Sequence, residues 1–364
     1  MDNTKLSTLQ AVSIILTITF SQSILTFPKA IMSVSGSSSL LNILYVGIIA
    51  FVLCVLIYKL FNKFPGLDLI DISEILGGKL FQKIIGFLFI AYIVFVSSIL
   101  LRTFAYCLQV VYYPMTDLIF IIAIFAASIP IACNMKYNAI FKATLALIPI
   151  VLFSVVFLFI ANAKYFNLQN VFPLLGNGIN ATFGIGVTNI FAFGGITALY
   201  LIPPLLKSHK QFKKVSLISI TLSVIYFILS IATILLMFNQ ESFKNELMPL
   251  YSAVRYIEFG TFFQRLDSIF LLIWVLASFC SLGVAYKLCI NVFKKITNTK
   301  NTNIISYPFA LLVLGCSLLP KTEAVTNFLE STVYRYVFLC FAIAVPIIIL
   351  ILASIKAKRI NIKE

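Results

Sequence analysis

Residues 10–33 read QAVSIILTITFSQSILTFPKAIMS, a stretch long enough to cross a bilayer as a helix but interrupted at its middle. Ser21, Gln22 and Ser23 stand in a row at the midpoint, and Pro28 follows about one turn later. Polar side chains and a missing backbone donor at mid-membrane depth are tolerated only where protein or a water-filled cavity satisfies the freed groups. The stretch therefore predicts an interrupted transmembrane helix that forms one wall of a binding cavity.

A second apolar stretch, residues 182–206, is interrupted in a comparable place. Its glycines and its final prolines are Gly184, Gly186, Gly194, Gly195, Pro203 and Pro204. The two interrupted stretches each open one half of the chain. Interrupted helices in corresponding positions of two halves are typical of transporters with a central site.

The composition is that of an integral membrane protein. Of the 364 residues, 61% are hydrophobic and 11% are charged, and the mean hydropathy is +1.06, whereas an average soluble domain has about 25% charged residues. A membrane span needs about 20 apolar residues, and ten windows account for nearly the whole chain, which predicts one all-α transmembrane domain over 1–364. The windows are about 10–33, 40–60, 84–106, 118–133, 143–161, 182–206, 215–238, 266–290, 304–319 and 334–355.

The formal net charge of +15 does not indicate nucleic-acid binding, because the basic residues lie in short loops between the spans. The positive-inside rule explains them if both termini are cytoplasmic. The clearest cytoplasmic marker is KSHKQFKK at 207–214. Another inner segment, 61–83, alternates charged and apolar residues at helical spacing and predicts a helix that lies at the inner surface.

The order of the spans predicts five plus five. The first repeat covers about 10–161 and the second about 182–355. An odd number of spans per half inserts the second half upside down relative to the first, which is what an inverted repeat requires.

A helix broken at mid-depth exposes N–H groups at one half-helix start and C=O groups at the other half-helix end. The first set attracts a carboxylate and the second attracts an ammonium group or a metal cation, and a free amino acid presents both charges. The alternative is that the small residues only permit close helix packing. The candidate ligand-binding residues are Ser21, Gln22, Ser23, Ile24, Phe193, Gly194, Gly195 and Thr197.

Five further residues are candidates for lining or gating. Trp274, the only tryptophan, either lines the cavity or packs against the first span. Pro28 starts the second half of that span, and Lys29, the one base well inside a span, either acts in gating or snorkels outward. Arg265 and Asp267 are too close in sequence to face each other on one helix side, so we expect each to pair elsewhere or to meet water at the outer mouth.

Catalysis and strong proton coupling are not expected. No acidic residue falls within the hydrocarbon depth of the predicted spans, where proton-coupled carriers usually keep one. A cation site built from backbone carbonyls with Ser278 and Ser281 is a weaker alternative, and the sequence offers no other metal or cofactor site. His209 is the only histidine, and no nucleophile, base and orienting group come together as an enzyme would need.

Several motifs resemble those of the spore germination permease family, the B subunits of GerA-type germinant receptors within the amino acid, polyamine and organocation transporter superfamily. The motifs are FPKA at 27–30, FPG at 64–66, ILG at 75–77, FPLLGNGI at 172–179 and, most specifically, FFQRLDSIFLLIW at 262–274. The resemblance covers nearly the whole chain. It implies a ten-span LeuT-like fold in the spore inner membrane and the sensing of small germinants, commonly amino acids, beside an A subunit and a lipoprotein C subunit.

The chain departs from the family pattern at three places. At the first-span break it has Ser21–Gln22–Ser23 where the family often has Gly-x-Gly. In the sixth span it has Gly195 where the family often has Glu after Phe-Gly. It also has Gln264 where Glu commonly precedes the arginine. Because the sixth-span carboxylate would be a natural partner for an ammonium group, its loss leaves a germinant other than an amino acid open. The sequence therefore predicts a germinant receptor subunit, with a free-standing amino acid transporter of the same fold as the alternative.

Overall fold

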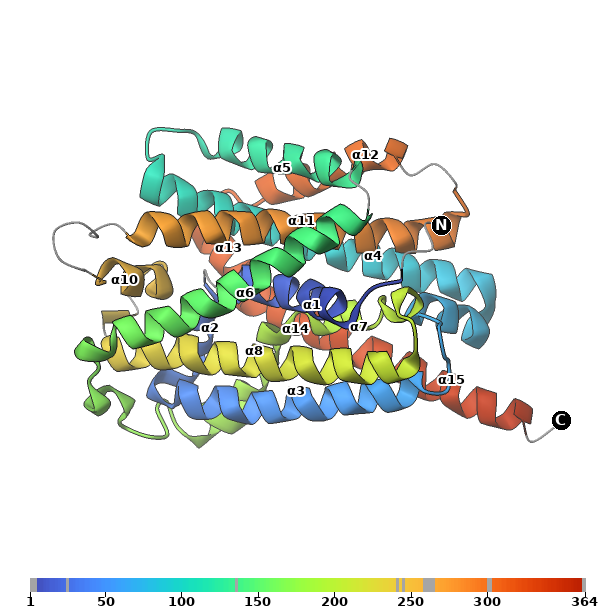
Figure 1. Ribbon diagram of the computed structural model, residues 1–364, viewed down its shortest axis with the longest axis horizontal. Coiled ribbons are helices and arrows are strands. Elements are labelled where there is room, and N and C mark those ends of the chain that lie inside the picture. Colours follow the sequence, from blue (N-terminus) through green and yellow to red (C-terminus); the bar gives the residue numbers. More distant parts are fainter. Residues whose placement is uncertain are drawn as a thin grey trace.

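The protein is a bundle of helices. The computed structural model describes residues 5–23, 26–134, 137–239, 242–243, 246–257, 266–299 and 303–361, and these contain no strand. The long helices run along one axis of the molecule (Figure 1). They are α3 (Ser39–Phe61), α4 (Leu69–Tyr112), α5 (Leu118–Asn134), α6 (Tyr137–Ala161), α8 (His209–Met237), α11 (Leu266–Thr297) and α12 (Asn303–Leu318).

The helices identify a multi-pass membrane protein. Within the described residues, six helical segments are long and apolar enough to cross a membrane, namely 27–61, 69–112, 139–161, 209–237, 266–297 and 323–357. Three shorter apolar helices lie at 8–21, 118–131 and 305–318. The all-α membrane class is confirmed, and the count of ten crossings, which adds the interrupted sixth span, stays a prediction.

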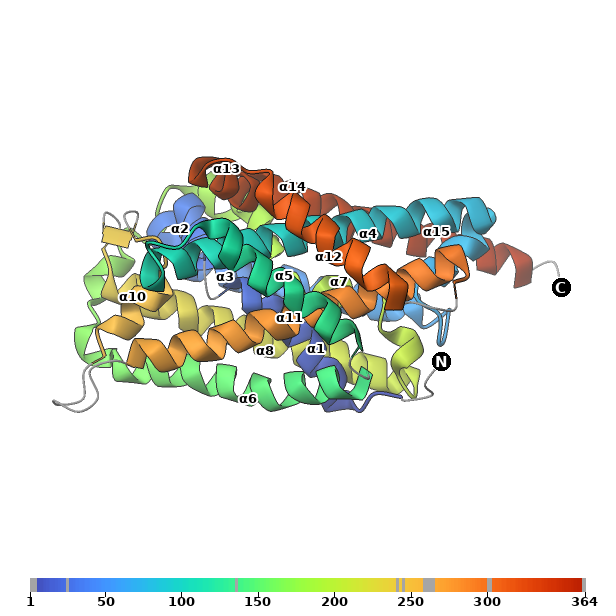
Figure 2. The same cartoon turned by 90° about the horizontal axis from the view of Figure 1, so that it is seen from above.

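The first span is broken, as its sequence predicts. Helix α1 (Thr8–Ser23) ends at the polar run, and α2 (Phe27–Ser35) begins after Thr26, with Pro28 in its first turn. Helix α1 lies in the middle of the bundle, in contact with α6, α8 and α11 (Figures 1 and 2). The helix that leads into the break is therefore surrounded by protein rather than by lipid, which is where interrupted helices are tolerated.

The sixth span contains almost no regular α-helix. It consists of a π-helical turn (Asn180–Gly184), a 3₁₀-helix (Ile185–Phe193), the single turn α7 (Ile196–Leu199) and a 3₁₀ turn (Pro203–Leu205). A nine-residue 3₁₀-helix is well beyond the usual three or four residues and often marks a functional hinge. The predicted interruption of this span is confirmed.

Helix α4 starts with a separate segment. Asp68 caps its N-terminus in a reciprocal hydrogen-bonding arrangement with Asp71, and Gly78, with φ +75° and ψ −175°, bends the chain sharply. A positive φ of this size favours glycine. The predicted amphipathic segment thus forms a helical element of its own before the bend, with Ile70 buried and Ile75 exposed.

The last helix begins earlier than its sequence predicts. It runs without a break through α13 (Glu323–Phe328), α14 (Tyr334–Phe338) and α15 (Val345–Asn361), with two π-helical segments between them. The predicted start near 334 is wrong because Thr322 caps the helix, and of the polar residues in the turns that follow, Thr326 and Glu330 are buried. This places Glu330 and Arg335 inside the bundle.

Both described chain ends lie at the same end of the bundle (Figure 1). Backbone hydrogen bonds close this end around the sixth span: Leu6 N–H donates to the Leu205 carbonyl at 2.8 Å, and Leu69 N–H donates to the Tyr200 carbonyl at 3.0 Å. Lys295 Nζ lies 2.6 Å from Asp68 Oδ2. We call this the closed end.

Candidate functional site

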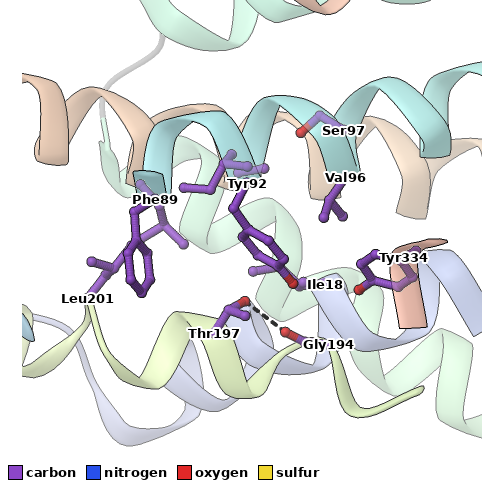
Figure 3. Close-up of a pocket in the computed structure, with 12 residues that line it drawn as sticks. Ile18, Phe89, Tyr92, Val96, Ser97, Gly194, Thr197, Leu201 and Tyr334 are labelled. Atoms are coloured by element: carbon purple, nitrogen blue, oxygen red, sulfur yellow. Dashed lines mark hydrogen bonds between the residues drawn. The ribbon is translucent and has the colours of Figure 1, made fainter. Parts of the chain in front are cut away.

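A small cavity lies in the middle of the bundle, beside the sixth-span interruption. Its walls come from α1, α4, the sixth span, α11 and α14 (Figure 3). It has about 40 Å³ of room for water centres, which corresponds to roughly three water molecules. We call it the central cavity; it is lined by Ile18, Phe89, Tyr92, Ile93, Val96, Ser97, Gly194, Thr197, Leu201, Ala285, Leu288 and Tyr334.

The central cavity is mostly apolar with a few polar groups at one end. Thr197 Oγ1 donates to the Gly194 carbonyl at 2.7 Å, and the hydroxyls of Tyr92 and Tyr334 interact across the cavity. Small-solute sites have this character, with apolar walls and a few placed polar groups. At this size, however, a larger solute requires Tyr92 or Tyr334 to move, so the structure represents a closed state.

The sixth span divides its predicted ligand-binding residues between two roles. Gly194 and Thr197 line the central cavity. Phe193 is buried on the other side, with its ring 5.3 Å from that of Phe227. Gly195 packs against α1: its N–H donates to Thr19 Oγ1 at 3.2 Å. For Phe193 and Gly195, the structure therefore corresponds to the packing alternative.

The first span contributes a different residue from those expected. Ile18 lines the central cavity, whereas Ser21, one turn later, donates to Ser281 Oγ of α11 at 2.8 Å and does not line it. Gln22 and Ser23 form the end of α1, but their side chains, like all of Ile24, lie outside the described part of the chain.

Trp274 lies away from the central cavity. Its ring centroid is 4.5 Å from that of Phe104 on α4, and its Nε1 finds no hydrogen-bond acceptor among the described residues. It is buried in packing contacts, and its ring partner is on α4.

Three of the four residues predicted for gating or for polar structural roles lie in the described part of the chain. Pro28 sits in the first turn of α2, where a missing N–H costs nothing, and Lys29 beside it is half-buried. Asp267 accepts a hydrogen bond from Tyr251 of α10 (Pro249–Arg255) at 3.0 Å, so it pairs with another element, as expected. Arg265 lies outside the described residues.

The candidate cation position has one unusual feature. Ser278 Oγ is fully buried and has no hydrogen-bond partner within the described chain, while Ser281 is paired with Ser21. Among the described residues, no three His, Cys, Asp or Glu side chains gather in a group that could hold a metal ion.

Glu330 is the functional candidate that the sequence reading missed. It is 6% exposed and lies in a π-helical segment of the last span, a feature that is frequent at functional sites. Thr103 Oγ1 of α4 donates to Glu330 Oε2 at 3.1 Å, and Thr26 Oγ1, at the start of α2, donates to Glu330 Oε1. The expectation that the spans hold no acid is therefore wrong, and Thr322 followed by Glu323 was the start signal that could have revealed it.

Arg335 is a second buried ionisable residue of the same helix. Its guanidinium donates to Thr188 Oγ1 and to the Ala30 carbonyl, both at 3.0 Å, and lies 4.8 Å from the centroid of the Phe191 ring. Arg335 thereby ties α2 and the 3₁₀-helix of the sixth span to α14. Together with Lys287, which is buried in α11, it shows that Lys29 is not the one base inside a span.

Two further hollows continue the central cavity toward the end of the bundle opposite to the chain termini. The first, of about 10 Å³, contains Glu330 and shares Val96 and Tyr334 with the central cavity. The second, of about 160 Å³, shares Thr103 with the first and reaches Glu323 at the start of the last helix. We call them the throat and the vestibule.

Comparisons with known proteins agree with one another. The model of the spore germination protein family matches residues 5–325. Spore germination protein B2 of Bacillus subtilis (strain 168) is 24% identical over 366 residues, covering 97% of this chain and 96% of that protein. Spore germination protein KB of the same strain is 24% identical (86% and 85% covered), and spore germination protein A2 is 23% identical (99% and 98% covered).

Among solved structures, the chain is similar to Mhp1, a nucleobase-cation-symport-1 family transporter, in a closed conformation with bromovinylhydantoin bound. The TM-score is 0.62 at 16% sequence identity, over 91% of this chain and 76% of that one. This likeness supports the expected LeuT-like transporter fold, and neither the relatives nor the neighbour is an enzyme. Given a family model that spans most of its length, the chain belongs to the spore germination protein family.

Proposed function

We propose that this chain is the B-type subunit of a spore germinant receptor and binds a small germinant in the central cavity. The observation that carries the proposal is the position of this cavity beside the interrupted sixth span, in a chain of the spore germination protein family. Ile18 of α1 and Phe27 of α2, on the two sides of the first-span interruption, line the central cavity and the throat. The backbone groups that interrupted helices free suit a small solute that carries a carboxylate, an ammonium group or both.

Binding can be converted into a conformational change because movable elements border the cavities. Arg335 connects α14 to α2 and to the 3₁₀-helix of the sixth span, and the Tyr334 ring packs on Phe27 and Phe191 of the same two elements. Thr26 connects α2 to Glu330. A solute that moves Tyr334 therefore acts on the helix that carries both contacts. A ligand shifts such an equilibrium only through its different affinity for the two states.

In this proposal the chain works with partners. It lies in the spore inner membrane with both termini in the cytoplasm, crosses it ten times as two inverted repeats, and passes its change to an A subunit and a lipoprotein C subunit. The support for a receptor role is the family and the length over which the germination relatives align. An amino acid is the first germinant class to test.

The alternative function is a free-standing amino acid transporter, and the likeness to a transporter structure favours it. The two functions differ in whether the solute is carried across the membrane. Uptake of a radiolabelled solute into vesicles that contain this chain alone would establish the transporter.

The test of the proposal is ligand-dependent stabilisation of the purified full-length chain. We expect at least one member of a panel of amino acids, nucleosides and sugars to raise its melting temperature, because a ligand that binds only the folded state stabilises it. Ala285→Leu, which places a larger side chain into the central cavity, should remove the shift. Ala91→Leu, at an exposed position of α4, should keep it; equal shifts in both variants would place the ligand elsewhere.

A further inference from the structure

The throat combines a buried carboxylate with aromatic faces. It is lined by Glu330, Thr103, Phe27 and Tyr334 together with apolar side chains of α4. The rings of Phe27 and Tyr334 are nearly parallel, 24° apart, with centroids separated by 5.9 Å. A carboxylate beside aromatic faces is the combination that proteins use to recognise ammonium groups.

The Glu330 carboxylate has capacity left for a cation. Each oxygen accepts one threonine hydroxyl, whereas an ionised carboxylate offers about four lone-pair sites. Within the described chain, no lysine or arginine forms an ion pair with it. Thr26, which donates to Glu330 Oε1, immediately precedes α2, and the N-terminus of a helix favours negative charge.

The size and position of the throat fit one end of a solute. Its room of about 10 Å³ corresponds to roughly one water molecule, which is also the size of a primary ammonium group. Tyr334 lies one helical turn after Glu330 and lines both the throat and the central cavity. When the Tyr334 ring moves, a solute can place an ammonium group at Glu330 and its remainder in the central cavity.

We propose that Glu330 binds the ammonium group of a cationic or zwitterionic germinant, and that the rings of Phe27 and Tyr334 contact the same ammonium group. This inference rests on the proposed function and narrows its ligand class. The sixth span has Gly195 at the position where the family often has a glutamate, and the proposal assigns the role of that carboxylate to Glu330 of the last span. The ammonium partner is then supplied by a different helix that faces the same group of cavities.

The experiment compares matched probes on the purified full-length chain. The ammonium compounds are L-alanine and L-valine with their amines, ethylamine and isobutylamine. The matched compounds are L-lactate and L-2-hydroxyisovalerate, in which a hydroxyl replaces the ammonium group. Glucose and inosine represent solutes without an ammonium group.

We expect at least one ammonium compound to raise the melting temperature of the wild-type protein, and its hydroxy analogue not to. Glu330→Gln should weaken binding of that compound about tenfold or more, because a charge-assisted hydrogen bond is lost. Without ligand, Glu330→Gln should melt no lower than wild type, because the amide oxygen accepts one threonine hydroxyl, the amide NH₂ donates to the other threonine oxygen, and a buried charge is removed. A purely structural Glu330 would instead give a lower ligand-free melting temperature with unchanged ligand affinity.

Two more variants complete the design. Glu74→Gln makes the same change at a side chain that accepts a hydrogen bond from Gln82 and lines none of the three hollows. This variant should bind the ammonium compound as wild type does. Phe27→Leu keeps the carboxylate but removes one aromatic face, and should weaken ammonium binding about fivefold. It tests the pocket even if Glu330→Gln does not fold.

The outcomes separate the two proposals. If only lactate, hydroxyisovalerate, glucose or inosine stabilises the protein, or if Glu330→Gln and Phe27→Leu bind the ammonium compound as wild type does, the ammonium site is rejected and germinant binding stands. If no probe of the whole set stabilises the wild-type chain, both are rejected.

Discussion

Gly195 shows how one residue connects the two interrupted spans. A Cβ atom at this position would lie 2.4 Å from both the Ile15 carbonyl oxygen and Thr19 Oγ1. The first of these is backbone and cannot move without shifting α1. The close approach of the sixth span to α1 therefore requires glycine here.

We expect Gly195→Ala to destabilise the protein by about 1–3 kcal/mol, the usual cost of overpacking, measured as a lower melting temperature. The matched control is Gly315→Ala on α12, where an added Cβ meets no atom within 4 Å and alanine is the better helix former. Similar melting temperatures for Gly195→Ala and wild type would contradict the close approach described here.

Asp68 at the closed end makes stability depend on pH. Burial raises its pKa to about 6 from the ordinary 3.8, against the lowering effect of the Lys295 ammonium group. Because the folded state binds the proton more tightly than the unfolded chain, the contribution of Asp68 to stability is complete below about pH 4 and is lost as the pH rises to about 6.

Asp68→Asn cannot titrate, and Asp71 still pairs with Lys295 at 2.5 Å in the wild-type geometry. We therefore expect the melting temperature of wild type minus that of the variant to fall between pH 4 and pH 6. A difference in melting temperature that stays constant over this range would show that the pKa of Asp68 is not raised in the folded protein.

At the residue scale, the sequence predicts the break but not which side chains line the cavity. The polar run before Pro28 is enough to indicate an interruption, since few alternatives satisfy such groups in a membrane. Whether Ile18 or Ser21 faces the cavity depends on the rotation of α1, and the partner of Ser21, Ser281, is 260 residues away in sequence. No local pattern contains that information.

At the scale of elements, the last helix joins the two broken spans. Arg335 binds α2 and the sixth span, and Glu330 binds α2 and α4. We expect Arg335→Lys to lower stability by about 1.5–3 kcal/mol, because a single ammonium group cannot reproduce the guanidinium fork. Faster hydrogen exchange in residues 27–35 and 185–193 would locate the loss.

Arg102→Lys is the control for that variant. Arg102 makes one long contact, 3.4 Å to the Ser317 carbonyl, so its replacement should change the melting temperature little. An Arg335→Lys protein with wild-type exchange in both segments would mean that other contacts hold these elements together.

Element boundaries were predictable where apolar windows coincide with helices, as for α3 and α12. The last helix was not, because its first turns are polar and largely exposed, and Glu330 in them is buried through contacts with α4 and the start of α2. A hydropathy window detects what faces lipid, whereas Glu330 is placed by protein neighbours. Glu330 falls in the turns that the predicted window left out, and Arg335 lies just inside the predicted start at 334.

At the scale of the whole molecule, the closed end and the vestibule define one state of a transporter-shaped bundle. Backbone contacts of Leu6 and Leu69 with the sixth span close one end, while the vestibule of about 160 Å³ lies toward the other. In the proposed receptor, a germinant enters by the vestibule and acts where the sixth span is interrupted. The class of fold and the family were accessible from the sequence, whereas the three hollows and the carboxylate of Glu330 in the throat required the structure.

The central claim is that a small solute in the central cavity starts germination. The measurement that tests it most directly is the germination rate of spores that carry Ala285→Leu, beside spores that carry Ala91→Leu, at matched amounts of the protein and with the germinant that this receptor recognises. The account predicts that Ala285→Leu spores fail to respond while Ala91→Leu spores germinate at the wild-type rate. Germination of Ala285→Leu spores at the wild-type rate would contradict it.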